Sequence, residues 1–85
     1  MGKAVEPDQA FGRVVRELRQ RKRLSQEKLA FAAELDRNYI SLIELGKNSA
    51  SVKTVFKLCT ALEIRPSEFF GFVEAELSGD DASDG

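Results

Sequence analysis

The chain has 85 residues, of which 42% are hydrophobic and 32% charged, enough for one domain with one compact core. The net charge of −1 is unevenly divided, since residues 11–57 hold eleven Lys and Arg against five Asp and Glu, whereas residues 58–85 hold one Arg against seven acids. The single cysteine excludes an internal disulfide, and the absence of histidine excludes a Cys/His metal site.

The N-terminal part of the chain predicts a short lead-in followed by a helix. Residues 1–7 carry no apolar pattern, so we expect a flexible N-terminus. Asp8 is a candidate cap for a first helix that runs to about Lys22. The apolar residues of this helix recur with the rhythm of one helical face, and basic residues cover the remainder. These apolar residues are Ala10, Phe11, Val14, Val15 and Leu18.

Residues 25–46 predict two short helices joined by a tight turn. Ser25 caps the first and Asp36 caps the second, because their side-chain oxygens can accept hydrogen bonds from free amides in the next turn. Gly46 ends the second helix, since glycine adopts the left-handed conformation without steric cost. Both helices bury an apolar stripe, yet the second opens with polar side chains that face away from it. A protein that reaches into a DNA major groove needs such a braced helix.

The C-terminal part predicts two more helices and a tail. Ser51 caps a fourth helix, whose apolar side is expected to hold Val52, Val55, Phe56, Cys59 and Leu62. Pro66 fits the first turn of a fifth helix, which is rich in phenylalanine. Residues 78–85 are acidic and lack apolar anchors, which predicts a disordered tail. The fold expected for residues 8–77 is therefore all-α, a compact five-helix bundle.

Several stretches of this pattern resemble the helix-turn-helix family of phage Cro and repressor proteins. They are residues 24–30, the Tyr39-Ile40-Ser41 step, residues 43–47 and residues 54–62. The resemblance spans about residues 10–70, and the run over residues 35–41 looks closest to the controller proteins of restriction–modification systems. It implies a lambda-repressor-like fold and a homodimeric transcription regulator that binds double-stranded DNA at a pseudo-palindromic operator.

The resemblance also implies roles for individual side chains. It places four of them at base edges, namely Arg37, Asn38, Ser41 and Leu42. The chemistry agrees, because Arg37 can donate two hydrogen bonds to guanine, Asn38 can pair with adenine and Leu42 can touch a thymine methyl. Contacts to the DNA backbone are implied for Ser25, Gln26, Tyr39, Lys47, Asn48 and Ser49. Ser25 also reads as a cap alone, and Tyr39 equally well as an aromatic residue at the core edge.

In this family an arginine of the first helix pairs with a glutamate near the end of the recognition helix. The resemblance therefore implies a structural ion pair between Arg19 and Glu44 rather than base contact by either. The sequence departs from the family at Arg23, where a glycine often ends the first helix, at Leu45, which replaces a polar residue, and at Arg65, where a Ser or Asp cap is usual.

One recognition helix reads only a few base pairs, so two copies about 34 Å apart are expected on an operator. The fifth helix carries more aromatic surface than one small core readily hides. We therefore predict a dimer interface at Phe69, Phe70, Phe72 and Val73, with closure of the monomer core as the alternative. The alternative function is an antitoxin-like or other protein-interaction module that buries this helix in another protein.

The sequence argues against an enzyme, because it offers no histidine, no metal-ligand set, no phosphate-binding loop and no nucleophile paired with a base. We expect neither a cofactor nor a small-molecule ligand, since no second domain is present to form a pocket. No apolar run approaches the roughly 18 residues that cross a membrane, which predicts a cytoplasmic protein.

Overall fold

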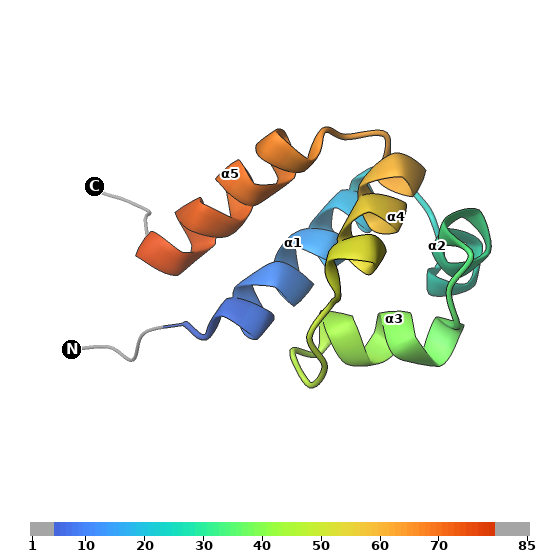
Figure 1. Cartoon of the computed structure of the whole chain (residues 1–85), viewed down its shortest axis with the longest axis horizontal. Coiled ribbons are helices and arrows are strands. Elements are labelled where there is room, and N and C mark those ends of the chain that lie inside the picture. Colours follow the sequence, from blue (N-terminus) through green and yellow to red (C-terminus); the bar gives the residue numbers. More distant parts are fainter. Residues whose placement is uncertain (1–4, 80–85) are drawn as a thin grey trace.

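The computed structural model describes residues 5–79, and this part of the chain folds into five helices without strands. They are α1 (Pro7–Arg21), α2 (Gln26–Ala33), α3 (Arg37–Glu44), α4 (Val52–Leu62) and α5 (Pro66–Ser78). Helices α1 and α5 run alongside each other, α4 lies against α2, and α3 forms one edge of the molecule (Figure 1). The prediction of an all-α five-helix bundle is confirmed. Most of the expected N-terminal lead-in and acidic tail, residues 1–4 and 80–85, lies outside the described residues.

Helix α1 begins two residues earlier than the sequence predicted. Its cap is Glu6 rather than Asp8, and Pro7 occupies the first helical position. The backbone N–H of Glu6 donates to the side-chain oxygen of Gln9 at 3.3 Å. Proline is favoured at the start of a helix because its missing N–H would have no partner there. The prediction of a cap at Asp8 was wrong, because a proline at the first helical position places the cap at the residue before it, Glu6.

The other predicted caps are confirmed. The Ser25 hydroxyl accepts from the Lys28 N–H, the Asp36 carboxylate from the Asn38 N–H and the Ser51 hydroxyl from the Thr54 N–H, at 3.0, 3.0 and 3.1 Å. Gly46 has a φ of 75° and ends α3, where the N–H of the next residue reaches back to a carbonyl of the last turn.

The turn between α1 and α2 contains Arg23 with a φ of 59°, the left-handed conformation that glycine adopts most easily. An L-residue held there costs about 1–2 kcal/mol. The turn is held by the Leu24 N–H, which donates to the Arg19 carbonyl at 3.1 Å, and by the Arg19 guanidinium, which donates to the Leu24 carbonyl at 2.8 Å. Arg23, where the family often has a glycine, thus adds conformational strain to a turn that these two hydrogen bonds hold in place.

All five helices contribute to one hydrophobic core. Its buried apolar members are Ala10, Val14, Val15, Leu29, Ala30, Ala33, Ile40, Ile43, Val55, Leu58, Cys59, Leu62, Phe69 and Val73. Burial raises the pKa of the Cys59 thiol, which favours its protonated, unreactive form. Two predictions for α4 were wrong, because Val52 and Phe56 are exposed. The inward face of α4 runs through residues 55, 58, 59 and 62, so Phe56 lies beside it and Val52 projects at the helix start.

Helix α1 approaches α3 closely at Gly12. A Cβ atom added to Gly12 would lie 2.1 Å from the carbonyl oxygen of Ile43, well inside van der Waals contact. The absent side chain therefore sets the distance between α1 and α3. None of the helices in residues 5–79 is long and apolar enough to cross a lipid bilayer.

Candidate nucleic-acid interface

Helix α3 lies at an edge of the molecule, with one face buried and the other open (Figure 1). Ile40 and Ile43 anchor it in the core. Arg37 and Asn38 are exposed in its first turn, and the side chain of Asn38 makes no hydrogen bond within residues 5–79. Ser41, one turn further along, is half-buried. The structure thus brings Arg37 and Asn38 to the open first turn of one braced helix, with Ser41 one turn behind them.

Arg37 has one neighbour that sequence reasoning missed. Its Nε lies 4.0 Å from a carboxylate oxygen of Glu27 in α2, and both side chains are more than half exposed. An exposed ion pair at this distance contributes between 0 and about 1 kcal/mol, so Arg37 stays free to exchange this carboxylate for another partner. A separation of ten residues across a turn gives no sequence signal for such a pair.

Leu42, the fourth predicted base contact, is half-buried in α3.

The Arg19 and Glu44 side chains meet between α1 and α3 and are 11% and 4% exposed. The Arg19 Nε and Nη2 atoms donate to the two Glu44 carboxylate oxygens at 2.6 and 3.0 Å. The Gln26 amide donates to the same carboxylate at 3.0 Å. The hydrogen bond to Glu44 raises the pKa of Arg19, which keeps the guanidinium charged. This three-residue cluster, which we call the Glu44 cluster, joins α1, α2 and α3.

The residues predicted to contact the DNA backbone fall into two groups. Lys47 and Asn48 are exposed, and their side chains make no hydrogen bond or ion pair within residues 5–79. The Ser25 hydroxyl accepts a hydrogen bond, and its own O–H donor remains available. The donors of the other group are already engaged. The Tyr39 hydroxyl donates to the Ser49 carbonyl at 3.2 Å, and the Ser49 hydroxyl donates to Asp8 at 2.8 Å. Gln26 is intermediate, because only one of its two amide protons reaches Glu44.

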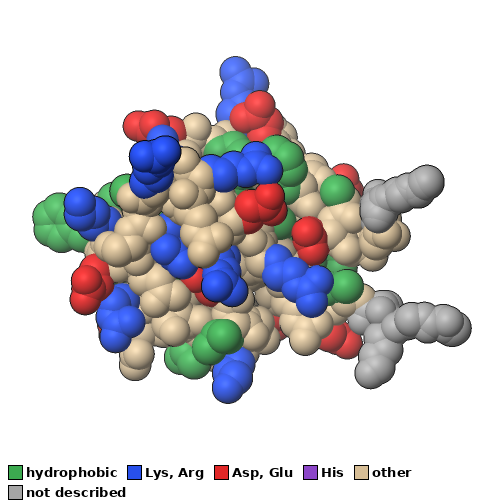
Figure 2. All heavy atoms as spheres, turned by 180° about the vertical axis from the view of Figure 1, so that it is seen from behind, with side chains coloured by type: hydrophobic (Ala, Val, Ile, Leu, Met, Phe, Trp, Pro, Cys, Tyr) green, Lys and Arg blue, Asp and Glu red, His purple; other side chains and the backbone are tan. Residues whose placement is uncertain are grey.

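Basic side chains spread across the face opposite to the view of Figure 1. Figure 2 shows Lys and Arg groups over the middle of this face, with fewer carboxylates among them. The exposed arginines of α1 lie in the basic segment, residues 11–57. A surface of this charge attracts a polyanion over distances of about 10 Å at moderate salt.

Comparison with known proteins decides the family. A helix-turn-helix family model matches residues 15–69. The control protein C.BamHI of Bacillus amyloliquefaciens is 43% identical over 63 residues, which cover 73% of this chain and 78% of the relative. The control protein C.MunI of a Mycoplasma species is 42% identical over 67 residues, covering 78% and 90% of the two chains. The chain belongs to the helix-turn-helix family of restriction–modification controller proteins.

Solved structures agree with this family. The controller protein C.AhdI from Aeromonas hydrophila superposes with a TM-score of 0.72 at 48% identity, covering 74% of this chain and 96% of the other. The controller protein C.Esp1396I, solved as a tetramer in complex with its natural 35 base-pair operator, superposes with a TM-score of 0.80 at 28% identity, covering 87% and 97%. The resemblance seen in the sequence is confirmed, and controller proteins are transcription regulators rather than enzymes.

Two of the four residues that were predicted to form a dimer interface on α5 lie in the core of the controller chain instead. Phe69 and Val73 are 0% and 5% exposed and belong to the monomer core, so they are not available to a partner. Phe69 packs edge-on against Phe11, with ring centroids 4.9 Å apart. Phe70 and Phe72 remain 43% and 44% exposed. Phe69 and Val73 lie one helical turn apart and face α1, which leaves Phe70 and Phe72 on the two flanks of α5.

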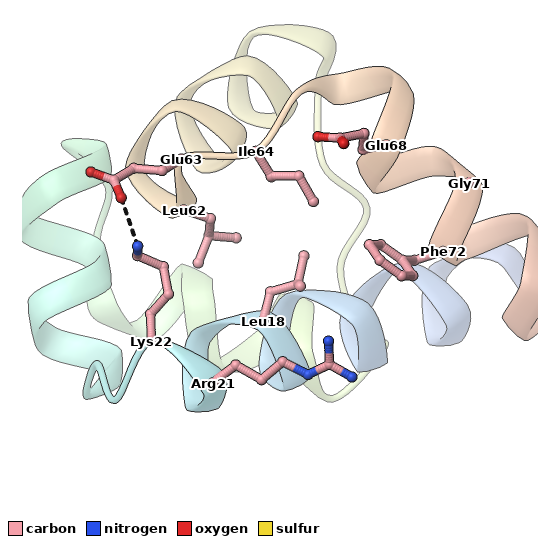
Figure 3. A pocket seen from close by; sticks show the side chains of 9 residues that line it. All are labelled: Leu18, Arg21, Lys22, Leu62, Glu63, Ile64, Glu68, Gly71 and Phe72. Carbon is pink, nitrogen blue, oxygen red and sulfur yellow. Dashed lines mark hydrogen bonds and ion pairs between the residues drawn. The ribbon is translucent and has the colours of Figure 1, made fainter.

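The two exposed phenylalanines line separate hollows. Phe70 borders a hollow of about 460 Å³ that reaches Ala50 in the α3–α4 loop and Leu77 near the end of α5. Phe72 borders a hollow of about 610 Å³ between the end of α1 and the α4–α5 connection, where Leu18, Leu62 and Ile64 supply apolar walls (Figure 3). The predicted single aromatic interface is therefore divided between two surfaces.

Proposed function

We propose that this controller protein is a transcription regulator that acts in the cytoplasm as a homodimer. In this proposal it binds a pseudo-palindromic operator sequence-specifically and controls restriction–modification genes. The observation that carries it is the open N-terminal half of α3, where Arg37 and Asn38 project from a helix anchored by Ile40 and Ile43. The operator complex of C.Esp1396I supports it, because that relative shares the fold over most of both chains.

The donors on α3 match the major groove. An arginine can donate two parallel hydrogen bonds to O6 and N7 of guanine, and an asparagine can bond N6 and N7 of adenine. Lys47 and Asn48 follow α3 in an exposed loop, where the sugar–phosphate backbone passes beside an inserted helix. We therefore assign base reading to α3 and backbone contact to the loop after it. Selection of bound duplexes from a random pool, followed by footprinting, identifies the operator and tests the proposal.

The division between base and backbone contacts predicts different behaviour for two variants. Arg37→Ala should cost about 1–3 kcal/mol on the selected operator and relax the preference at one base position. Lys47→Ala should weaken operator and random duplexes by the same factor, because a phosphate contact carries no sequence information. Fluorescence anisotropy with both duplexes at one salt concentration measures this. Equal losses for both variants on both duplexes would contradict the assigned roles.

The Phe70 flank of α5 is the better dimer surface. Its hollow is lined by apolar side chains from α1, α4 and α5 and extends to the α3–α4 loop. A second copy seated there would contact the loop that follows α3, so the interface would lie next to both recognition helices, as adjacent half-sites favour. The Phe72 hollow lies beside the far end of α1, next to the α4–α5 connection. No residue of α3 or of the loop after it borders that hollow, so we assign the dimer to the Phe70 flank instead.

Two substitutions on α5 separate these surfaces. Phe70→Asp should convert the dimer to a monomer and weaken operator binding by about tenfold or more, or about 1.4 kcal/mol, because one half-site is then held without the other. Phe72→Asp, at almost the same exposure, should leave both properties near the wild-type values. Sedimentation and anisotropy measure the two effects, with circular dichroism to verify folding. A wild-type chain that sediments as a monomer at high concentration would refute the dimer.

The alternative function, a protein-interaction module, would use the Phe72 hollow. Figure 3 shows its apolar side chains directed into one space, with the Lys22–Glu63 ion pair of 2.7 Å beside them. Nothing on this surface selects a particular partner. A stable heterocomplex together with no binding to any selected duplex would favour this alternative over the operator-binding regulator.

A further inference from the structure

A small polar hollow lies where α1, α2 and α3 meet, beside the open face of α3. It has a volume of about 230 Å³ and is lined by Arg16, Arg19, Gln26, Ser41, Glu44 and Leu45. Three of these residues form the buried Glu44 cluster. Arg16 is exposed, and Ser41 is half-buried.

The Glu44 carboxylate accepts three hydrogen bonds inside this hollow. One oxygen accepts from Arg19 Nε, and the other accepts from Arg19 Nη2 and from the Gln26 amide. The remaining Arg19 terminal nitrogen donates to the Leu24 carbonyl. The charges of Arg19 and Glu44 therefore cancel locally, and neither residue offers the hollow a net charge.

Arg16 differs from the neighbouring arginines of α1, Arg13 and Arg21, because it has no carboxylate close to its guanidinium in the described part of the chain. Arg13 lies 3.5 Å from Glu76, and Arg21 lies 2.8 Å from Glu17. Arg16 has no carboxylate partner within residues 5–79. The positive charge of the hollow thus comes from one guanidinium that is free to bind an anion.

We propose that Arg16 binds a phosphate group of the DNA backbone at this hollow. This role rests on the operator-binding function proposed above and adds a contact on α1, outside the two helices of the reading motif. A guanidinium presents donors in a planar fork that matches two phosphate oxygens.

Two further donors complete the site. Gln26 uses one amide proton on Glu44 and keeps the second. The Ser41 hydroxyl makes no side-chain hydrogen bond within the described chain, and its rotation can direct the proton toward the hollow. A phosphate held here lies next to α3, on the strand that flanks the groove in which α3 sits.

The test is the salt dependence of binding to a random-sequence duplex, measured by fluorescence anisotropy. A plot of the logarithm of the binding constant against the logarithm of the salt concentration has a negative slope. Loss of one phosphate contact makes this slope less steep by about 0.9. Arg16→Gln should show this loss and raise Kd equally on the random duplex and on the selected operator. The ratio of the variant Kd to the wild-type Kd should be about 3.5-fold larger at 50 mM than at 200 mM salt, as a slope change of 0.9 requires. Arg16→Lys should keep the slope, because its charge still displaces a counterion.

Arg13→Gln and Arg21→Gln are the matched controls, since each removes one exposed arginine charge from the same helix. Both should leave the slope near the wild-type value. An unchanged slope in Arg16→Gln, or the same change in all three variants, would overturn the site at Arg16. A wild-type protein that binds no duplex at all would instead overturn the proposed function, so the two failures are distinguishable.

Discussion

Replacing Gly12 by alanine should lower the free energy of unfolding by about 3 kcal/mol or more, the upper end of the cost of overpacking a core. The new methyl group would lie 2.1 Å from the Ile43 carbonyl oxygen and 2.9 Å from the Glu44 carbonyl oxygen. Both obstacles are backbone atoms, which cannot rotate away as a flexible side chain can. Helix α1 and helix α3 would have to separate, and the core between them would open.

Gly71→Ala is the control, because it makes the same chemical change in the middle of another helix. Apart from the neighbouring residues and the backbone of α5 itself, no heavy atom lies within 4 Å of a Cβ added at Gly71. The free energy of unfolding of this variant should rise by about 0.5–1 kcal/mol, since alanine loses less backbone entropy than glycine in a helix. Urea unfolding followed by circular dichroism measures both. A Gly12→Ala protein as stable as the wild type would show that α1 and α3 do not pack at the distance described.

The second large effect is expected for Glu44→Gln, which keeps the shape of the side chain and removes its charge. Arg19 would then be almost buried without its counterion, at a cost of about 3 kcal/mol. In a domain of this size that corresponds to a fall in Tm of roughly 12 °C or more. The same variant should weaken DNA binding at all sequences, because α3 loses its attachment to α1 and α2.

Glu17→Gln serves as the matched control for this experiment. Glu17 pairs with Arg21 at 2.8 Å, but both side chains are more than half exposed. Removal of this charge should cost about 0.3–0.5 kcal/mol, as for other exposed pairs one helical turn apart. Calorimetric melts of the two variants at the same pH provide the comparison. If Glu44→Gln melts at the wild-type temperature, the ion pair does not stabilise the fold.

Local signals in the sequence were sufficient for the helices. The caps at Ser25, Asp36 and Ser51 depend on the chemistry of one residue and its next turn, and the structure contains all three. The Arg19–Glu44 contact came from the family resemblance, since a separation of 25 residues has no local signature. The start of α1 was missed by two residues, although Pro7, which marks it, is also a local signal.

Local sequence signals could not predict which phenylalanines of α5 are buried. Phe69, Phe70 and Phe72 are chemically alike, and only the direction of α1 across α5 decides that Phe69 is buried while the others are half exposed. The sequence also did not predict that Arg16 lacks an ion-pair partner among the described residues, because Glu76 lies beside Arg13 only once α5 packs against α1. Both properties belong to the packing of helices distant in sequence.

The hydrogen bonds of Tyr39 and Ser49 have a consequence for the energetics of DNA binding. Tyr39 holds the Ser49 carbonyl and Asp8 holds the Ser49 hydroxyl, so the loop after α3 is fastened to α3 and to α1. In the proposed complex, Lys47 and Asn48 would therefore meet the DNA from a backbone that is already ordered. Little conformational entropy remains to be lost in this loop on association, so more of each contact's free energy contributes to affinity. Tyr39 and Ser49, themselves predicted to contact phosphates, would in this way also serve recognition by preorganising the loop.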